Sequence, residues 1–600
     1  MASINDVVIK IATVNGTGSA SANSLLRKAI FRMGVPVVGK NYFPSNIQGL
    51  PTWYEIRVTG EGYCCRSDRV DIMVAMNAQT YARDMAEVEP GGCLIYDSTW
   101  PRSSLLNRDG ITIIGIPLSK MCNEHFDGAR ARILMKNIAY VGAIAALLAV
   151  DLDVIKELLE ETFADKSHLI DSNMEAIHLG YDHVMEKFPC PLPAHVKKLD
   201  KTEGQIVIDG NTAAGLGCMY AGATVGAWYP ITPSTSLMDA FRNFCSRYRV
   251  DPETGKRTYA IIQAEDELAA IGMVLGANWM GARSFTPTSG PGISLMSEFI
   301  GFGYYAEIPA VIFNVQRVGP STGMPTRTQQ CDLISCAYAS HGDTKHVLLF
   351  PADPAECFSM SPQAFDLAER LQTPVMVLTD LDIGMNDWMV PELEWDDSYV
   401  PDRGKVYTAE DLEGMEKFYR YLDVDGDGIP YRTFPGVHPK GSYFTRGSGH
   451  TKYGAYTENS ADYQEVMDRL LAKWETARTL VPDAEIRYSK FNKAAILTVG
   501  SGDGACKEAL DRLDARNVKL NYCRVRAFPF TDAVHEFIDQ HDVVYIVEQN
   551  RDAQLRTLLI EDIDADQKKL VPVLHYDGMP LNAGSVVDGV LAEIKKGRAA

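Results

Sequence analysis

The sequence predicts an α/β protein made of three parallel-sheet domains. Short apolar β runs alternate with amphipathic helical segments along most of the chain, which is the pattern of parallel strands joined by crossover helices. The 600 residues are too many for one hydrophobic core. The composition, with 46% hydrophobic and 23% charged residues, is that of a soluble globular protein.

The first α/β domain is predicted for residues 1–195. It opens with a strand over 7–14, a turn, and an amphipathic helix over 21–30. An apolar stretch over 138–150 is too short to span a bilayer and indicates a buried helix. Three further β runs are expected in the same parallel sheet: 70–76, 92–96 and 111–116.

The second α/β domain is predicted for residues 200–390, after a linker rich in Pro and Lys. From 391 to 485 the sequence is rich in Pro, Gly, Asp and Tyr, so we expect a long insertion that ends in one helix. A third α/β domain is predicted for 486–600. The strands expected in the second and third domains are 205–209, 260–263, 310–315, 346–350, 374–379, 494–500 and 543–547.

Composition excludes several classes of protein. The formal net charge of −20 argues against nucleic acid or an anionic membrane as a partner. The twelve cysteines contain no CxxC pair, so neither a disulfide framework nor a zinc or iron–sulfur site held by this chain alone is expected. The first residues have no features of a secretory signal. A cytoplasmic location fits these observations best.

Three strand-to-helix transitions gather in the second domain. In Tyr229-Pro-Ile-Thr-Pro-Ser-Thr235, Thr232 is predicted to cap a helix that starts at Pro233, which leaves N–H groups for a small carboxylate. In Glu265-Asp-Glu267, three acids at a helix start suit the helix dipole or a proton relay. The segment 285–294 places glycines at a tight turn.

Arg317 is the fourth feature, because it ends a very apolar strand and precedes the loop Gly319-Pro-Ser-Thr-Gly323. A buried guanidinium is unfavourable unless it has an internal acid partner or an anionic ligand. Its geometry suits both oxygens of a carboxylate. Since ligands of α/β proteins bind at the carboxyl ends of parallel strands, these loops indicate a pocket for a 2-oxo acid.

In this order, these segments resemble the alpha subunit of 2-oxoacid:ferredoxin oxidoreductases with the gamma domain fused in front, and more narrowly the 2-oxoglutarate type. The resemblance covers essentially the whole chain and rests on YPITPST, QAEDELAAIGMVLGA, TSGPGISLM and QRVGPSTGMPT. It implies a gamma-type first domain, a pyrimidine-binding domain of thiamine enzymes and a transketolase C-terminal-like domain. It also implies conversion of a 2-oxo acid and CoA into acyl-CoA, CO2 and reduced ferredoxin.

The resemblance assigns roles to individual residues. Thr232 would contact the substrate, and Arg317 would pair with a substrate carboxylate, supported by Thr326. Glu267 would protonate N1′ of the aminopyrimidine of thiamine diphosphate, with Glu265 as the alternative. The remaining expected contacts are Ser234 and His450 with substrate, and Tyr229, Pro230, Ile231, Gly290 and Gly292 with cofactor. His450 could instead be an exposed loop histidine.

Much of the family's chemistry is absent from this sequence. The diphosphate and Mg²⁺ motif is missing, and Gly502-Asp-Gly504 is expected to be a structural turn. The resemblance therefore implies a separate beta subunit that carries Mg²⁺ and a 4Fe–4S cluster and receives ferredoxin, in a dimer of alpha–beta heterodimers. Two points stay open: whether Gly16-Thr-Gly18 holds CoA phosphates or only packs, and whether Asp423, Asp425 and Asp427 bind a metal.

Three alternatives remain at this point. The substrate could be pyruvate or another 2-oxo acid, with either direction of reaction. A non-catalytic assembly subunit would require none of Thr232, Glu267 and Arg317. A stand-alone thiamine decarboxylase is disfavoured, because the diphosphate motif is missing.

Overall fold

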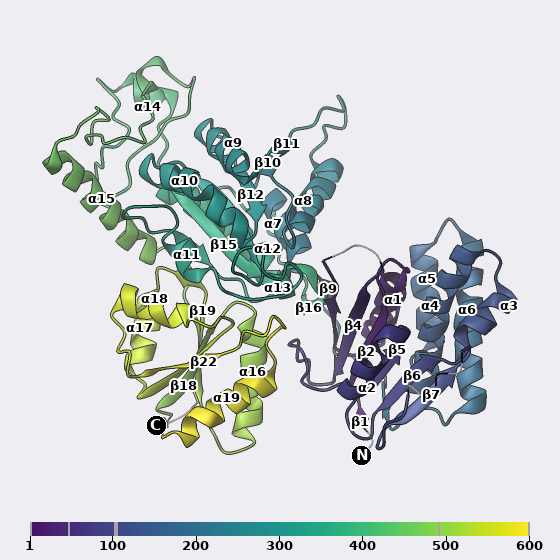
Figure 1. The fold of residues 1–600 in the computed structure, drawn as a ribbon. Coiled ribbons are helices and arrows are strands. Elements are labelled where there is room, and N and C mark those ends of the chain that lie inside the picture. Colours follow the sequence, from purple (N-terminus) through teal and green to yellow (C-terminus); the bar gives the residue numbers. More distant parts are fainter. Residues whose placement is uncertain (1–2, 46–48, 101, 103–105, 490–491, 598–600) are drawn as a thin grey trace. The chain divides into compact units, whose positions relative to one another are not determined.

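The computed structural model describes the chain except residues 1–2, 46–48, 101, 103–105, 490–491 and 598–600. The α/β class is confirmed (Figure 1). The chain forms two compact units, described separately below. Unit 1 comprises Met1–Ile208, Asn386–Glu392 and Asn582–Gly584, and unit 2 comprises Asp209–Met385, Leu393–Leu581 and Ser585–Ala600.

Unit 1 contains a six-stranded sheet in the order β3-β4-β2-β5-β6-β7. The predicted strands pair in parallel: β2 (Asp6–Val14), β5 (Ile72–Ala75), β6 (Cys93–Asp97) and β7 (Thr112–Ile116). A wholly parallel sheet was the wrong expectation here, since β3 (Val37–Tyr42) and β4 (Pro51–Thr59) form an antiparallel hairpin that extends from β2. These two strands bury Lys40 and Glu55, which interrupts the apolar pattern.

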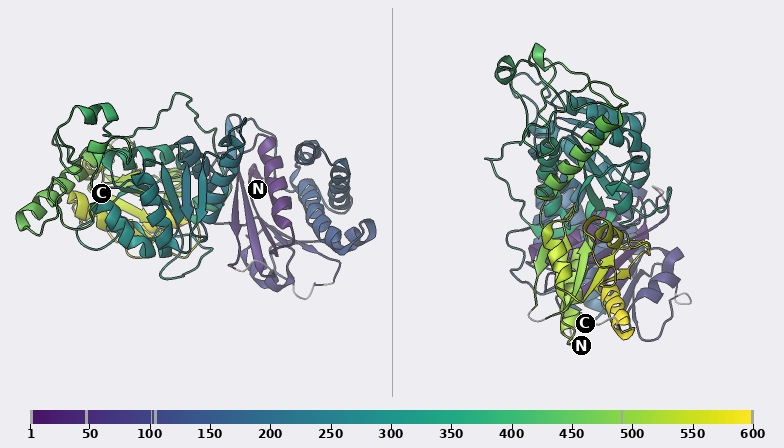
Figure 2. Two further views of the ribbon diagram at one scale, coloured as in Figure 1. Left: turned by 90° about the horizontal axis from the view of Figure 1, so that it is seen from above. Right: turned by 90° about the vertical axis from the view of Figure 1, so that its left-hand side faces the viewer.

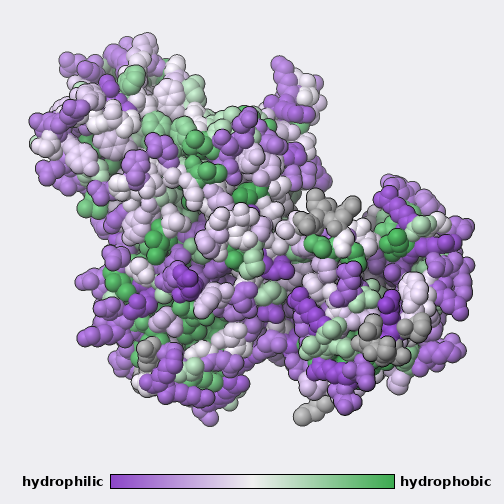
Figure 3. Space-filling view, in the orientation of Figure 1, coloured by the Kyte–Doolittle hydropathy of each residue, from purple (hydrophilic) through white to green (hydrophobic). Residues whose placement is uncertain are grey.

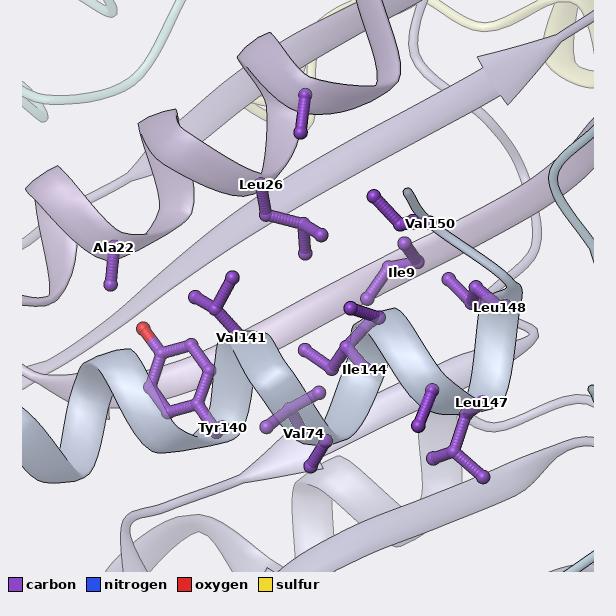
Figure 4. Close-up of a cluster of buried hydrophobic side chains, with 14 of the residues drawn as sticks. Ile9, Ala22, Leu26, Val74, Tyr140, Val141, Ile144, Leu147, Leu148 and Val150 are labelled. Atoms are coloured by element: carbon purple, nitrogen blue, oxygen red, sulfur yellow. The ribbon is translucent and has the colours of Figure 1, made fainter. Parts of the chain in front are cut away.

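The core of unit 1 lies between this sheet and its helices. Helix α4 (Ala129–Leu148) is long and apolar enough to cross a membrane, but most of its apolar stretch is buried in the unit, as expected. Figure 4 shows α4 side chains packed against Leu26 and Ile9. The hydroxyl group of Tyr140 donates to Asn23 Oδ1 at 2.7 Å, so its polar end is satisfied.

Helix α4 also packs closely against α6 (Ser167–Lys187), beside α1 (Ser19–Arg32) and α5 (Leu152–Thr162) (Figure 2). Two glycines allow this approach. A Cβ atom on Gly142 would lie 1.9 Å from Ile177 O, and a Cβ on Gly180 would lie 1.9 Å from Ala139 O.

A two-stranded antiparallel ribbon completes unit 1. It pairs β9 (Gln205–Ile208) with β16 (Trp388–Pro391), so the expectation that 205–209 joins the second parallel sheet was wrong. Asp387, just before β16, exchanges two backbone hydrogen bonds of 3.0 Å with Gly39. It also accepts a hydrogen bond of 2.5 Å from the Tyr54 hydroxyl group. A shorter pairing joins β1 (Ser3–Ile4) to β8 (Ala194–His195).

Unit 2 contains a seven-stranded sheet that is parallel apart from its last strand, β20. Helices cover the sheet, which explains the continuous apolar runs of its strands. In spatial order the strands are β11 (Ala260–Gln263), β10 (Val225–Trp228), β12 (Ser284–Thr288), β13 (Ala310–Gln316), β15 (Pro374–Asp380), β14 (Val347–Leu349) and β20 (Ala527–Phe528). The helices are α7 (Gly210–Tyr220), α8 (Thr235–Tyr248), α9 (Glu267–Trp279), α10 (Gly290–Tyr305), α11 (Leu333–Ala337), α12 (Pro354–Leu371) and α13 (Leu381–Met385).

A five-stranded sheet forms the C-terminal part of unit 2. Its order is β17 (Glu485–Arg487), β19 (Asn521–Val525), β18 (Ala494–Val499), β21 (Val543–Glu548) and β22 (Leu570–Leu574). Its helices are α16 (Gly502–Asp514), α17 (Asp532–Asp539), α18 (Gln554–Ile563) and α19 (Ala583–Lys595). Gly502 opens α16, and the Asp503 carboxylate accepts a hydrogen bond of 2.5 Å from the Tyr522 hydroxyl group, which is a structural role.

The loop-rich insertion precedes this sheet and contains α14 (Ala409–Glu413) and η2 (Pro439–Gly441) before the long helix α15 (Ser460–Arg478). A buried ion cluster ties α15 to the end of α10. The Glu307 carboxylate accepts hydrogen bonds from Arg469 Nη1 at 3.0 Å and from Lys473 Nζ at 2.9 Å.

We predict that Gly180→Ala destabilises unit 1 by about 1–3 kcal/mol, because the methyl group would meet the backbone of α4. Gly276→Ala in α9 is the control, since a Cβ there meets no atom within 4 Å. Calorimetric unfolding of the purified chain checks both variants. A Gly180→Ala protein that unfolds at the wild-type temperature would contradict the close packing of α4 and α6.

Candidate functional site

Arg317 lies at the carboxyl end of β13 and is only 8% exposed. Its Nη1 atom donates to the Thr232 carbonyl oxygen at 2.8 Å, whereas its Nε atom is buried without a partner. Among the described residues, no carboxylate lies within ion-pair distance of this guanidinium. Burial lowers its pKa, and the charge of Asp332 opposes that shift. The site therefore holds a buried cation that forms no direct ion pair and is acted on by the charge of Asp332.

The Tyr229–Thr235 segment does not form the expected cap. Helix α8 begins at Thr235 with Ser234 as its N-cap residue, so the prediction that Thr232 caps a helix starting at Pro233 was wrong. The Ile231 carbonyl oxygen accepts the N–H groups of Ser234 at 2.9 Å and Thr235 at 3.2 Å. It also accepts the Ser234 hydroxyl group at 3.0 Å. These donors are used inside the turn, which presents the Thr232 carbonyl group to Arg317.

The three acids at the start of α9 have different surroundings. Asp266 is the N-cap and accepts a backbone N–H group of the first turn at 2.7 Å. Glu265 is exposed, whereas Glu267 is buried and its carboxylate has no hydrogen-bonding partner among the described residues. A Cβ on Gly292 would lie 3.1 Å from Glu267 Cγ, so this glycine lets α10 approach Glu267.

A cavity of about 790 Å³ opens beside Arg317. Of the residues predicted from sequence, Arg317 and Gly290 line it, together with the 319–322 loop. The C-terminal part of unit 2 contributes Asn550, Arg551, Asp552, Gln554 and Tyr576. Arg551 is exposed on the rim and forms a 2.8 Å ion pair with Asp552.

The sequence motifs missed Asp332 and Asn211. Asp332 lines the cavity, and its carboxyl group accepts a hydrogen bond of 3.0 Å from Asn314. Asn211 on α7 steadies the turn of Thr232, because its Nδ2 atom donates to the Pro233 carbonyl oxygen at 2.8 Å. The only sequence signal for Asp332 and Asn211 was that each is a polar residue within a largely apolar stretch.

The other predicted contacts have mixed surroundings. Thr326 is buried, and its hydroxyl oxygen accepts a hydrogen bond of 3.3 Å from Arg327. Tyr229 and Pro230 are exposed after β10, and Ile231 is half-buried.

His450 is buried, so the expectation of an exposed loop histidine was wrong. Its ring stacks on Tyr421 at 4.0 Å and lies 5.0 Å from the Tyr305 ring. Burial lowers the pKa of its imidazole. His450 does not line the cavity.

The acidic loop at 423–427 surrounds an internal cation. Lys405 Nζ donates to both oxygens of Asp425 at 2.6 and 2.8 Å and to Asp427 at 2.7 Å. Asp423 instead accepts the N–H groups of Gly426 at 2.9 Å and Gly428 at 2.8 Å. The ammonium group thus takes the place that a metal ion would need.

The Gly16–Gly18 turn has a left-handed backbone at both glycines. Gly18 has a φ of 83°, and a Cβ on it would lie 2.3 Å from Leu134 Cδ2. The positive φ favours glycine without any ligand, whereas the exposed Leu134 side chain could move aside for a Cβ atom.

Two family models match parts of this chain. The model described as "Pyruvate ferredoxin/flavodoxin oxidoreductase" matches residues 8–183, and "Pyruvate flavodoxin/ferredoxin oxidoreductase, thiamine diP-bdg" matches 216–418. The alpha subunit of 2-oxoacid:ferredoxin oxidoreductase 2 from Aeropyrum pernix is 30% identical over 99% of this chain and 98% of its own length. The chain belongs to the 2-oxoacid:ferredoxin oxidoreductase alpha-subunit family.

Two further members of this family are informative. The 2-oxoglutarate synthase subunit KorA of Archaeoglobus fulgidus is 33% identical over 57% of this chain and 88% of its own length. The solved 2-oxoglutarate:ferredoxin oxidoreductase from Magnetococcus marinus, with 2-oxoglutarate, coenzyme A and succinyl-CoA bound, superposes with a TM-score of 0.88. It is 28% identical and is matched over 98% of this chain and 100% of its own. The resemblance inferred from the sequence motifs is confirmed.

We predict that Ca²⁺ and EDTA leave the thermal stability of the wild-type chain unchanged, because Lys405 already neutralises the acidic loop. Lys405→Gln should lower the stability, and Ca²⁺ should restore it by replacing the lost positive charge. Thermal unfolding with and without Ca²⁺ measures both effects. Lys452→Gln, which removes an exposed pair with Glu465, is the control. Stabilisation of the wild-type chain by Ca²⁺ would contradict this account.

Proposed function

We propose that this chain is the fused alpha and gamma subunit of a thiamine-diphosphate-dependent 2-oxoglutarate:ferredoxin oxidoreductase. It would convert 2-oxoglutarate and CoA reversibly into succinyl-CoA, CO2 and reduced ferredoxin. The observation that carries this proposal is the buried Arg317 guanidinium, which has no carboxylate partner in the described chain and faces a cavity. The names of the relatives support 2-oxoglutarate as the substrate.

Arg317 would bind the carboxylate next to the reacting keto group. Its remaining N–H groups are available for this role, and the burial of the guanidinium strengthens the attraction. Thr232 and Thr326 would belong to the same substrate wall. Arg551 on the rim would attract the distal carboxylate, which pyruvate lacks.

The residues around Glu267 suit the pyrimidine ring of thiamine diphosphate. Glu267 is a mostly buried residue whose carboxylate lacks a partner in the described chain, so it could share a proton with N1′ of that ring. The backbone at Gly290 and Gly292, with the 229–231 turn, would hold the ring. When bound, this cofactor supplies a group that stabilises the carbanion left by decarboxylation.

A partner subunit is required by this proposal, because the sequence lacks the diphosphate motif and the cluster cysteines. Apolar side chains are exposed on α9, directly after it and on α10, and one of them follows Glu267 in the sequence. They are Leu268, Met273, Met280 and Leu295. Figure 3 shows hydrophobic residues among polar ones at the surface of unit 2. We assign the exposed face of α9 and α10 to a beta subunit that carries Mg²⁺ and the 4Fe–4S cluster and receives ferredoxin, in a dimer of alpha–beta heterodimers.

The domain assignment follows from the same proposal. Residues 1–195 would be the gamma-type domain, 200–390 the pyrimidine-binding domain, 391–485 the insertion with its linking helix, and 486–600 the transketolase C-terminal-like domain. A non-catalytic assembly subunit is the weaker alternative, because it needs no buried guanidinium without a direct ion pair.

Glu267→Gln is expected to lower the rate of C2 proton exchange of bound thiamine diphosphate by roughly a hundredfold or more, since a neutral amide cannot protonate the ring. The exposed Glu265→Gln is the matched comparison and should keep wild-type exchange. Proton exchange followed by NMR in the complex with the beta subunit measures both. Loss of exchange in Glu265→Gln alone would transfer the role to Glu265.

Arg317→Ala is expected to raise KM for both 2-oxoglutarate and pyruvate by roughly ten- to a hundredfold, the effect of losing a charged hydrogen bond. Arg551→Ala should raise KM for 2-oxoglutarate by only about two- to fivefold, because Arg551 is exposed, and should spare pyruvate. Steady-state kinetics of the complex distinguish the two. Equal effects of Arg551→Ala on both acids would contradict its assignment to the distal carboxylate.

A further inference from the structure

The cavity beside Arg317 contains a carboxyl group that the proposed function leaves without a role. Asp332 is half-buried and lines the same cavity. Its Oδ2 atom accepts a hydrogen bond of 3.0 Å from Asn314, and its Oδ1 atom accepts one of 3.6 Å from the Cys331 thiol. Its backbone N–H group donates to Gln316 Oε1 at 3.0 Å. The Cys331 thiol has a second acceptor at a shorter distance, the Arg317 carbonyl oxygen at 3.4 Å, so the bond from Asn314 and the backbone bond are the ones that hold Asp332.

Two other elements make room for Asp332 and hold it. Gly290 opens α10, and a Cβ there would lie 2.7 Å from Asp332 Oδ2, so only glycine admits this carboxyl group. Gln554 on α18 donates to the Cys331 carbonyl oxygen at 2.8 Å and accepts the N–H group of Ile334 at 3.2 Å. The chain is thus held on both sides of Asp332.

Of the two carboxyl groups among the described residues that line the cavity, Asp332 has a raised pKa, whereas the bond from Arg551 lowers the pKa of Asp552. Burial raises the pKa of the Asp332 carboxyl group, while Asn314, Cys331 and Arg317 oppose the shift. Burial and the charge of Asp332 raise the pKa of the Cys331 thiol to about 12 and also raise that of Cys336. Arg317 stays protonated near neutral pH, although burial lowers its pKa.

We propose that the Asp332 carboxyl group takes up a proton from solvent when an anionic 2-oxo acid binds to Arg317, so that Asp332 sets the pH dependence of substrate affinity. This inference rests on the proposed function, because it needs a carboxylate at Arg317. Because Asp332 is half-buried, its ionised form repels a second carboxylate more strongly than an exposed carboxylate would. Protonation removes this repulsion and provides an O–H donor.

The sign of the effect follows from this linkage. Substrate favours the protonated form of Asp332, so substrate affinity is highest below the pKa of Asp332 and falls as pH rises through it. Asp332 acts on affinity through its charge, beside the carboxylate that Arg317 binds, and takes no part in the reaction itself.

The test compares KM for 2-oxoglutarate from about pH 5 to about pH 9 in the complex with the beta subunit. Wild-type KM should rise about tenfold as Asp332 ionises. Asp332→Asn keeps the acceptor for Asn314 and should show a low KM that does not change with pH. Asp468→Asn, at an exposed site on α15, should follow the wild type. An Asp332→Asn complex with the wild-type pH dependence would overturn the proposal.

A second measurement uses only the wild-type complex and so does not depend on the folding of a variant. Calorimetric titration with N-oxalylglycine, an unreactive isostere of 2-oxoglutarate, is done in two buffers of different ionisation enthalpy. The heats should differ, because up to about one proton is taken up per ligand. Binding with equal heats would refute the role of Asp332 alone. A complex that binds neither N-oxalylglycine nor 2-oxoglutarate would refute the proposed function as well.

Discussion

The Arg317 guanidinium imposes the main constraint on the functional half of this molecule. A buried cation is unfavourable unless hydrogen bonds and a counter-charge replace its hydration. Here the Thr232 carbonyl group supplies one acceptor, while Nε has none. The strand end, the turn before α8 and the glycine loop therefore surround a guanidinium group whose hydrogen-bonding capacity the described chain leaves partly unused. The unpartnered Nε–H group of Arg317 therefore favours the binding of an acceptor at this site.

The C-terminal part of unit 2 supports the segments around Arg317 through hydrogen bonds. The Ser501 hydroxyl group donates to Asp380 at the end of β15 and accepts a hydrogen bond of 2.8 Å from Gln549. Gln330 donates its backbone N–H group to the Gln549 carbonyl oxygen at 2.9 Å. Side chains that must meet a small substrate need such support, since displacements of about 0.5 Å already impair a site.

The sequence predicted features that depend on local pattern and missed those that depend on distant partners. The parallel strands of unit 2 were predictable because burial on both faces makes them continuously apolar, and Arg317 was predictable as a charge ending such a strand. The β3–β4 hairpin was missed, since buried Lys40 and Glu55 break its pattern. Asp332 stands in no motif, and its position becomes meaningful only beside Gly290, which is 42 residues earlier in the chain.

The β9–β16 ribbon has a consequence for how the protein is made. Strand β9 ends at Ile208, but its partner ends at Pro391. At ordinary elongation rates, the roughly 180 intervening residues take about 10 to 40 s to leave the ribosome. Throughout that interval unit 1 lacks both the second strand of its ribbon and the Asp387 carboxylate that binds Tyr54. The unit that emerges first from the ribosome thus receives these parts only after strands β10 to β15 of unit 2 have been synthesised.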